Sequence, residues 1–296
     1  MARMLRIAII GDPNRRAKDQ PLIDEAEKQC KALYAPITQL RLDLTANKRP
    51  SVRYNNKNLS RFDYVLIIPT ITYKEMFYTV ARMLGDKAKP FTHKQYLLVL
   101  NEDILFKYLH RRGIHTRKSV FICASSSLPL KNIKFPVIVR VGAKRVMVTN
   151  EQTLKDVIAF AERGKPIEIE MPIKAKKVVW TFVVGDEVVA GYEKVKRTVK
   201  STNVDDEVKK AGTTVSAALK CDYCALKFII DQNDECILDK VTFCPDFSNF
   251  QRITSKNIAR YVISYLKSKA EELWWPIGLL EAVKKISTKS EEKVKG

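Results

Sequence analysis

The stretch that most limits the fold of this chain is 224–249, which reads CALKFIIDQNDECILDKVTFCPDFSN. An apolar run ends at the polar sequence 231–234, and a second apolar run begins at Cys236. Asp, Gln and Asn between two apolar runs are typical of a tight turn between strands. The sequence therefore predicts a two-stranded hairpin with polar side chains at its strand ends, followed by a loop that contains Pro245.

Length and composition predict a folded protein with a sizeable core. The chain has 296 residues, of which 46% are hydrophobic, enough for one large domain or two to three small ones. It has no run of 18 apolar residues, so no membrane span is expected. The N-terminal sequence MARMLRIAIIG predicts a first strand and not a signal peptide. We expect a cytoplasmic protein without a membrane partner; the sequence leaves the oligomeric state open.

The chain is strongly basic, with 53 Lys and Arg against 33 Asp and Glu, a formal net charge of +20. Such a field attracts phosphates, nucleic acid or anionic surfaces. It is also what a lysine-rich surface with many ion pairs would give. The excess is uneven, because 106–118 and 131–145 contain no acid. His110 and His115 lie in or beside the first run, which predicts a solvated basic patch there.

Four of the six cysteines lie within 24 residues, at Cys221, Cys224, Cys236 and Cys244. One CxxC pair with two further cysteines could hold zinc. Cys224 and Cys236 fall in apolar, strand-like runs, where cysteine behaves as a small hydrophobe. We therefore expect buried thiols and no zinc, with a disulfide left open.

The first third of the chain predicts an open α/β unit. Strands are expected at 5–10, 37–44 and 62–69, with helices at 22–33 and 76–84. Gly11 is not part of a G-x-G-x-x-G sequence, so dinucleotide binding has no support. The remaining predicted elements are helices at 96–112, 154–161 (ending near Gly164), 205–219 and 257–266, and strands at 116–124, 135–141, 146–148, 167–173, 178–184 and 187–192.

This order of elements, with three local motifs, resembles the RimK-like branch of the ATP-grasp family over about 5–268. FVVGDEVVAGYEK, from Phe182, is similar to the family's FVVG-x-x-VVAA hairpin. SVRYNNKNLSRFDYVL, from Ser51, resembles its early hairpin and RFD strand, and SKNIARYVISYL, from Ser255, its last helix. The family consists of carboxylate–amine ligases that use ATP, in which a hairpin like the one predicted at 224–249 holds magnesium on the phosphates.

The resemblance implies a mixed α/β, α+β ATP-grasp fold. We expect a Rossmann-like pre-ATP-grasp domain over 1–94, a small lid subdomain over 95–173 and a C-terminal ATP-grasp sheet over 174–270. Residues 271–296 would form a polar tail.

Several departures from the family fall on the phosphate site. Arg140 stands where the family has a strand-end Lys; arginine can still bind phosphate, with another geometry. The sequence 142–145, GAKR, replaces a longer glycine-rich loop, and Val178 and Trp180 replace the family's D-x-R. We expect Trp180 to be a core residue. The sequence 200–203, KSTN, retains part of the family's RSN.

The metal site departs further. Lys227 takes the position of the family's first magnesium-holding Asp, and DKVT at 239–242 replaces E-V-N. Magnesium requires near-octahedral oxygen ligands, so one carboxylate beside Lys227 and Lys240 is a poor replacement. A register slip of one residue would place Phe228 there instead, which serves magnesium no better. We therefore expect a degenerate member that lacks magnesium, with ATP as a ligand that the resemblance allows.

Two sets of candidate site residues follow, and no residue is predicted to be catalytic. The candidate nucleotide-binding residues are Arg140, Lys144, Glu170, Lys227 and Asp239. The candidate polyanion-binding residues are Arg111, Arg112, Arg145, Lys174, Lys176, Lys177, Lys194, Lys196, Arg197 and Lys200. We expect the groove between lid and C-terminal sheet to be lined by positive charge.

Three functions are consistent with these observations. The first is a non-catalytic or weakly catalytic binding protein for RNA, a ribosomal surface or another polyanion, and it is the main expectation. The alternatives are an active carboxylate–amine ligase with a relocated metal site, and an ATP sensor without turnover.

Overall fold

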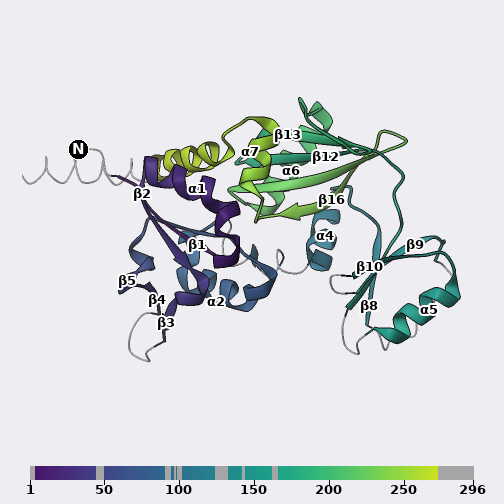
Figure 1. The fold of residues 1–296 in the computed structure, drawn as a ribbon, viewed down its shortest axis with the longest axis horizontal. Coiled ribbons are helices and arrows are strands. Elements are labelled where there is room, and N and C mark those ends of the chain that lie inside the picture. Colours follow the sequence, from purple (N-terminus) through teal and green to yellow (C-terminus); the bar gives the residue numbers. More distant parts are fainter. Residues whose placement is uncertain are drawn as a thin grey trace, which may run out of the picture.

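The structure is a computed structural model that describes residues 4–44, 50–90, 95–96, 98, 102–123, 133–141, 144–161 and 166–272. Its sheets and helices confirm the mixed α/β class (Figure 1). Several predictions lie outside the described residues: the turn at 142–143, Gly164 as a helix end, and the tail beyond 272. Among the described helices, none is long and apolar enough to cross a membrane.

The N-terminal part is a parallel sheet with a helix on each face. The sheet has the order β2-β1-β6-β7. Its strands are β1 (Arg6–Gly11), β2 (Lys31–Pro36), β6 (Tyr64–Ile67) and β7 (Ala88–Lys89), with helices α1 (Arg16–Gln29) and α2 (Lys74–Leu84). Side chains alternate between the two faces of a strand, so Ile9 packs with Leu22 of α1 while Ile10 packs with Phe77 of α2.

Short elements connect and flank this sheet. A small antiparallel sheet, β3-β4-β5, lies beside it. The elements are β3 (Arg41–Asp43), β4 (Ser51–Tyr54), β5 (Lys57–Asn58) and the 3-10 turns Pro13–Arg15, Ile37–Gln39, Leu59–Arg61, Ile71–Tyr73 and Gly85–Lys87.

The middle of the chain forms a separate sheet, here called the lid sheet. Helix α4 (Glu102–His110) precedes it. The strands are β8 (Ser119–Cys123), β9 (Val137–Val141), β10 (Lys144–Val148) and β11 (Pro166–Glu170), in the antiparallel order β10-β9-β11-β8. Helix α5 (Glu151–Phe160) covers one face, where Leu154 packs with Val139 and Ile169 in a small core of their own (Figure 1).

The C-terminal sheet is antiparallel, with the order β14-β13-β12-β15-β16. Its elements are β12 (Ala175–Val184), β13 (Glu187–Val195), β14 (Thr198–Ser201), α6 (Asp206–Leu219), β15 (Tyr223–Asp231), β16 (Cys236–Thr242), α7 (Phe247–Thr254) and a helix over 258–272. Helix α6 packs on one face through Val215, and α7 packs on the other through Phe250 against Phe182. The core on the α6 face and the core on the α7 face both include residues of the N-terminal sheet, whereas the core of the lid sheet is separate from them.

The predicted hairpin at 224–249 is confirmed as β15 and β16, with Phe228 opposite Leu238. Lys227 pairs with Lys240, so the register shifts between these pairs and Asp239 is an extra residue in a β-bulge. The bulge therefore lies at Lys227 and Asp239, two residues predicted for the nucleotide site.

Two local predictions are wrong. The strand expected at 37–44 is only partly present, because a 3-10 turn occupies Ile37–Gln39 and β3 follows at Arg41–Asp43. The strand that pairs in parallel with β1 is β2 at Lys31–Pro36, where the sequence predicted the end of a helix; the backbone becomes extended at Cys30. The loop expected after Pro245 contains helix α7, which Asp246 caps by accepting a hydrogen bond from the Asn249 N–H at 2.9 Å.

Candidate active site

The face of the lid sheet opposite α5 carries charged side chains. Val139, Ile167 and Ile169 point into the lid core, so strand alternation places Arg140, Glu168 and Glu170 on the other face. Arg140 Nε lies 2.7 Å from Glu170 Oε1. Arg145 on β10 lies 3.5 Å from Glu170 as well. The strands therefore set two arginines against two glutamates.

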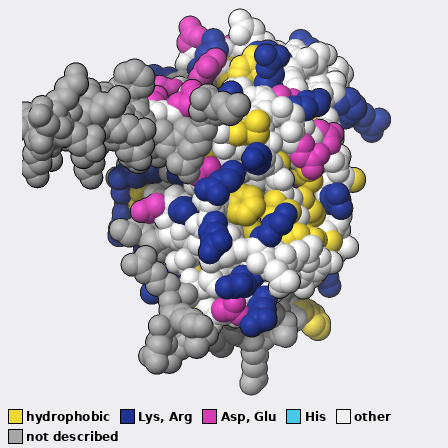
Figure 2. All heavy atoms as spheres, turned by 90° about the vertical axis from the view of Figure 1, so that its left-hand side faces the viewer, with side chains coloured by type: hydrophobic (Ala, Val, Ile, Leu, Met, Phe, Trp, Pro, Cys, Tyr) yellow, Lys and Arg dark blue, Asp and Glu magenta, His cyan; other side chains and the backbone are white. Residues whose placement is uncertain are grey.

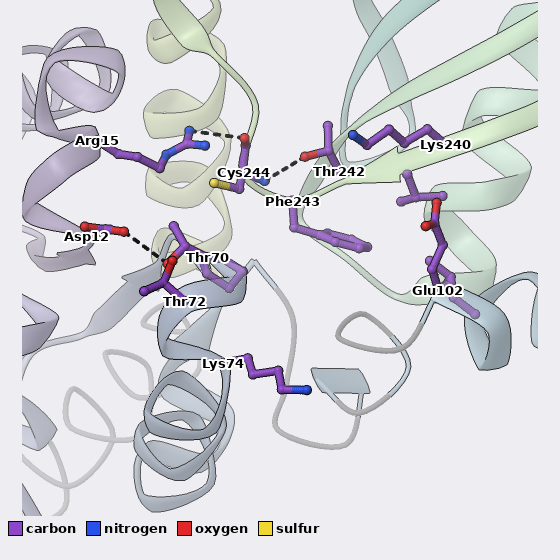
Figure 3. Close-up of a pocket in the computed structure, with 13 residues that line it drawn as sticks. Asp12, Arg15, Thr70, Thr72, Lys74, Glu102, Lys240, Thr242, Phe243 and Cys244 are labelled. Carbon is purple, nitrogen blue, oxygen red and sulfur yellow. Dashed lines mark hydrogen bonds between the residues drawn. The ribbon is translucent and has the colours of Figure 1, made fainter. Parts of the chain in front are cut away.

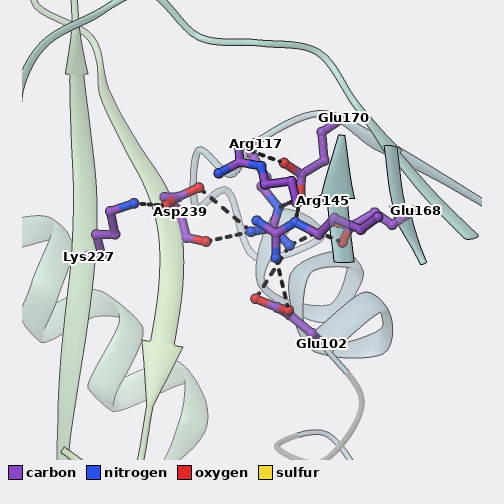
Figure 4. Close-up of polar contacts among 8 residues, drawn as sticks. Glu102, Arg117, Arg145, Glu168, Glu170, Lys227 and Asp239 are labelled. Carbon is purple, nitrogen blue, oxygen red and sulfur yellow. Dashed lines mark hydrogen bonds and ion pairs between the residues drawn. The ribbon is translucent and has the colours of Figure 1, made fainter. Parts of the chain in front are cut away.

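The C-terminal sheet contributes an ion pair to the same region (Figure 4). Lys227 Nζ on β15 donates to Asp239 Oδ2 on β16 at 2.6 Å. Asp239 lies in the bulge, which lets its side chain face Lys227 although the two residues are not register partners. Lys227 and Asp239, which the sequence predicts for one site, are thus in direct contact.

Arg117 joins the two sheets. Its side chain is only 3% exposed, and its Nη1 donates to the backbone carbonyl of Asp239 at 2.8 Å. Its Nη2 donates to Glu168 at 2.8 Å and lies 3.4 Å from Glu102. Its guanidinium also lies over the ring of Phe106 at 4.5 Å. One arginine thus contacts α4, β11 and β16.

These residues form what we call the inter-sheet charge cluster (Figure 4). It consists of Glu102, Arg117, Arg140, Arg145, Glu168, Glu170, Lys227 and Asp239. Four carboxylates face four cations, so the cluster is formally neutral. Burial alone would lower the pKa of Arg117, and the carboxylates of Glu102, Glu168 and Glu170 outweigh burial and raise it. Burial raises the pKa of Glu170, while Arg117 opposes that rise.

Beside the cluster lies a pocket of about 680 Å³ between the N-terminal and C-terminal sheets (Figure 3). The residues that line it are Asp12, Arg15, Pro69, Thr70, Thr72, Lys74, Glu102, Leu105, Lys240, Val241, Thr242, Phe243 and Cys244. They come from the carboxyl ends of β1, β6 and β16 and from α2 and α4. Glu102 belongs to both the pocket and the cluster, so the two are continuous.

The pocket presents three cations and three threonine hydroxyls. Thr70 donates to Asp12 at 3.2 Å, and Arg15 donates to the backbone carbonyl of Cys244 at 3.2 Å. Burial raises the pKa of Cys244 to about 12, so a neutral thiol and not a thiolate lines the pocket at neutral pH. Lys74 and Lys240 add positive charge. Asp12 and Glu102 belong to the same lining, so three cations and two carboxylates leave an excess of one positive charge, which suits an anionic group such as a carboxylate or phosphate.

A family model described as the RimK-like ATP-grasp domain matches residues 105–266. The chain belongs to the RimK-like ATP-grasp family. The predicted resemblance is thus confirmed. A search of curated proteins finds no match.

Solved structures agree in fold. The ATP-grasp ligase PsnB, complexed with a minimal precursor, Mg and ADP, superposes with a TM-score of 0.70 at 11% identity, covering 90% of this chain and 98% of PsnB. A RiPP-associated ATP-grasp ligase of Chryseobacterium gregarium, in complex with ADP and a leader and core peptide, gives 0.68 at 13%, covering 90% and 97%. D-alanine–D-alanine ligase from Bacillus anthracis, complexed with ATP, gives 0.65 at 14%, covering 91% and 98%. At these identities the likeness concerns the fold.

The donor set of this RimK-like ATP-grasp protein does not fit magnesium in the arrangement described. Asp239 is bound by Lys227 and lies 3.6 Å from Arg117 Nη1. Within the described part of the chain, no three His, Cys, Asp or Glu side chains gather as metal ligands would. Cys221 and Cys224 are buried free thiols, as predicted, and Cys236 and Cys244 are half-buried.

The structure brings most of the nucleotide-site candidates together. Arg140, Glu170, Lys227 and Asp239 all belong to the cluster, whereas Lys144 is exposed on β10. Within the cluster, carboxylates match the cations one for one, whereas Lys144 and Lys240, also expected to line the groove, lie outside the cluster. Arg145, predicted for a polyanion, pairs with Glu170 instead.

Sequence reasoning missed Arg117, Glu102 and Glu168. Arg117 lies in the acid-free run 106–118 and was expected in a solvated patch, yet its side chain is buried. The alternation of Glu168 and Glu170 along β11 was the available signal, since two acids on one face of a strand need partners if that face is covered.

The other polyanion candidates are on the surface, and several are paired. Lys176 contacts Asp234 at 2.6 Å, Lys177 contacts Asp205 at 2.8 Å, and Lys200 contacts Glu193 at 3.0 Å. The exposed candidates are Arg111 and Arg112 after α4, Lys174 before β12, and Lys194, Lys196 and Arg197 around the β13–β14 turn. On the face drawn in Figure 2, Lys and Arg are dispersed with Asp and Glu between them. Trp180 is half-buried and stacks on Tyr192 at 6.2 Å, in line with a core role.

Proposed function

We propose that this RimK-like ATP-grasp protein is an ATP-dependent carboxylate–amine ligase. Nucleotide binds between the lid sheet and the C-terminal sheet, and a carboxylate substrate, such as a peptide, binds in the pocket. The observation that carries this proposal is the continuity of cluster and pocket through Glu102. Because Glu102 borders both the cluster and the pocket, a nucleotide phosphate at the cluster would lie beside a substrate carboxylate that Arg15, Lys74 and Lys240 hold in the pocket.

The structural neighbours support this proposal. PsnB and the Chryseobacterium gregarium enzyme are named ligases, with precursor or leader and core peptides and ADP bound. In the reaction that the resemblance implies, the γ-phosphoryl group of ATP passes to the substrate carboxylate, giving an acyl-phosphate and ADP. An amine then attacks the acyl carbon, and inorganic phosphate and a proton leave as the amide forms.

The test is ADP release by the full chain, with ATP, magnesium, an amino acid mixture and peptides that end in a carboxylate. We expect ADP to appear only when both an acid and an amine are present, together with a product whose mass is the sum of the two less one water. Bound ATP without ADP release for any pair would contradict the ligase function.

A second candidate is nucleotide binding without turnover, and the Lys227–Asp239 ion pair favours it. A cation 2.6 Å from the remaining carboxylate supplies positive charge beside a phosphate without a metal. This function predicts that ATP raises the melting temperature equally with magnesium and with EDTA. A ligand effect that requires magnesium would contradict it.

Polyanion binding remains a third proposal, carried by the exposed cations of the β13–β14 turn. Lys194, Lys196 and Arg197 lie together there. Phosphate contacts of this kind release counterions, so retention on RNA should fall steeply with salt. No retention on RNA at low salt would exclude this function.

A further inference from the structure

The lid sheet is attached to the C-terminal sheet by backbone as well as by charge. The Leu238 N–H donates to the His115 carbonyl at 2.9 Å, and the Arg117 N–H donates to the Leu238 carbonyl at 3.2 Å. Thr116 and Leu238 form an isolated parallel bridge. The segment that leads into β8 is thus held along the middle of β16, and it positions the Arg117 side chain inside the cluster.

The lid has a hydrophobic core of its own, separate from the two cores that join the N-terminal and C-terminal sheets. Apolar burial therefore stabilises the lid internally more than it fixes the position of the lid. The position of the lid depends on contacts such as those of Arg117 with Glu168 on one side and Asp239 on the other (Figure 4).

The cluster is closely packed but incompletely hydrogen-bonded. Arg140 Nε and Glu170 Oε1 are buried 2.7 Å apart, yet neither makes an aligned hydrogen bond within the described part of the chain. Arg117 Nε is also buried without an aligned hydrogen bond in the part of the chain that the structure describes. Buried charged groups without aligned partners are costly, and a ligand that supplies oxygens in better geometry gains from satisfying them.

We propose that the cluster is a latch. Glu168, Glu170 and Asp239 form ion pairs with the cations that phosphate oxygens would otherwise bind. These internal ion pairs hold the lid closed on the C-terminal sheet. A polyphosphate opens the latch by replacing Glu170 on Arg117, whose Nε lies 3.4 Å from Glu170 Oε1, as well as on Arg140 and Arg145. The replacement of Glu170 by phosphate rests on the proposed nucleotide site, whereas the closure rests on the contacts of Arg117 and on the backbone bonds beside it.

The closure is tested by hydrogen exchange of the full chain with Arg117→Lys. An ammonium cannot reach Glu168, Glu170 and Asp239 together, as the planar guanidinium does. We expect the amides that join the two sheets, those of Arg117 and Leu238, to exchange about tenfold faster, with amides of β1 and β6 unchanged. Unchanged exchange of the Arg117 and Leu238 amides would overturn the latch.

The replacement of Glu170 by phosphate is tested by measuring the affinity for inorganic tripolyphosphate of the wild-type chain and of Glu170→Gln. This variant keeps the shape of the side chain and leaves the cluster one net positive charge. We expect tripolyphosphate to bind to the variant about tenfold more tightly than to the wild-type chain. Removal of one negative charge within about 4 Å of a phosphate is sufficient for a gain of this size. Glu151→Gln is the matched control, because Glu151 pairs with Lys155 on the exposed side of α5.

The outcomes separate the latch from the proposed function. Equal or weaker tripolyphosphate binding by Glu170→Gln contradicts the proposed replacement of Glu170 by phosphate. An equal gain in affinity in Glu151→Gln contradicts it as well. If the expected gain appears while no ATP and substrate pair yields ADP, the latch stands and the ligase function falls.

Discussion

Arg117 Nη1 donates a 2.8 Å hydrogen bond to the backbone carbonyl of Asp239, a residue 122 positions later in the chain. The acceptor lies in a β-bulge of the hairpin on which this family places its metal-holding acids. The bond therefore reaches from the start of the lid sheet to the centre of the expected nucleotide site. It explains why a basic residue from an acid-free run is buried: its charge is matched across two sheets.

Lys227→Asp should create an affinity for magnesium. The variant removes the cation that binds Asp239 and places a second carboxylate opposite the bulge, which gives two oxygen donors where the wild-type chain has one. We expect magnesium to raise ATP affinity in the variant by more than about tenfold relative to EDTA, as metal-bridged phosphates require. Calorimetric titration of ATP measures this. Lys194→Asp on β13 is the control, and an identical magnesium effect in both variants would contradict the prediction.

Asp19→Asn should stabilise the protein more at pH 7 than at pH 4. Burial raises the pKa of Asp19 from 3.8 to about 6, although Arg15 opposes the rise. Since the folded pKa is higher, the folded chain binds more protons than the unfolded chain between these values. The free energy of unfolding therefore falls as pH rises through that window, by about 3 kcal/mol in all.

Asparagine does not titrate, so the gain of Asp19→Asn over wild type should grow from pH 4 to pH 7 and then level off. Urea unfolding across this range measures the gain. Asp24→Asn, at an exposed position of the same helix, is the control and should show no such trend. A gain independent of pH would contradict the assignment.

Gly185→Ala should destabilise the chain by two separable effects. Gly185 has φ +59°, and a Cβ there would lie 2.6 Å from the Tyr265 ring. The left-handed conformation costs about 1–2 kcal/mol, and the overlap adds about 1–3 kcal/mol. Gly113→Ala isolates the first effect, because Gly113 has φ +77° with nothing within 4 Å of the added atom. Equal losses of unfolding free energy would show that Tyr265 does not restrict this turn.

Lys74→Ala with Lys240→Ala should weaken binding of the carboxylate substrate. Both lysines line the pocket, and neither belongs to the cluster. We expect KM for the acid substrate to rise about tenfold or more, since a charged contact is lost at each position, while ATP affinity stays unchanged. Initial rates of ADP release at varied acid concentration measure this. A changed ATP affinity with an unchanged KM would contradict the placement of the two ligands.

The sequence predicted the β15–β16 hairpin well, because turn chemistry between two apolar runs is a local signal. It also predicted that Lys227 and Asp239 belong to one site, through the resemblance to a family. It did not predict Arg117, since burial of an arginine depends on which strands meet in space. It missed β2, because the helical spacing of apolar residues continues through Leu33 although the helix ends before Cys30. It missed α7, where the cap by Asp246 follows directly on Pro245.

The central claim is that nucleotide phosphates bind between the lid sheet and the C-terminal sheet, and calorimetric titration of ATP into the wild-type chain and Arg140→Met tests it most directly. Arg197→Met, on the exposed β13–β14 turn, is the control. The account predicts ATP binding by the wild-type chain and the control, and at least about a tenfold loss in Arg140→Met, since a charged contact to phosphate is removed. No binding by the wild-type chain, or undiminished binding by Arg140→Met, would contradict it.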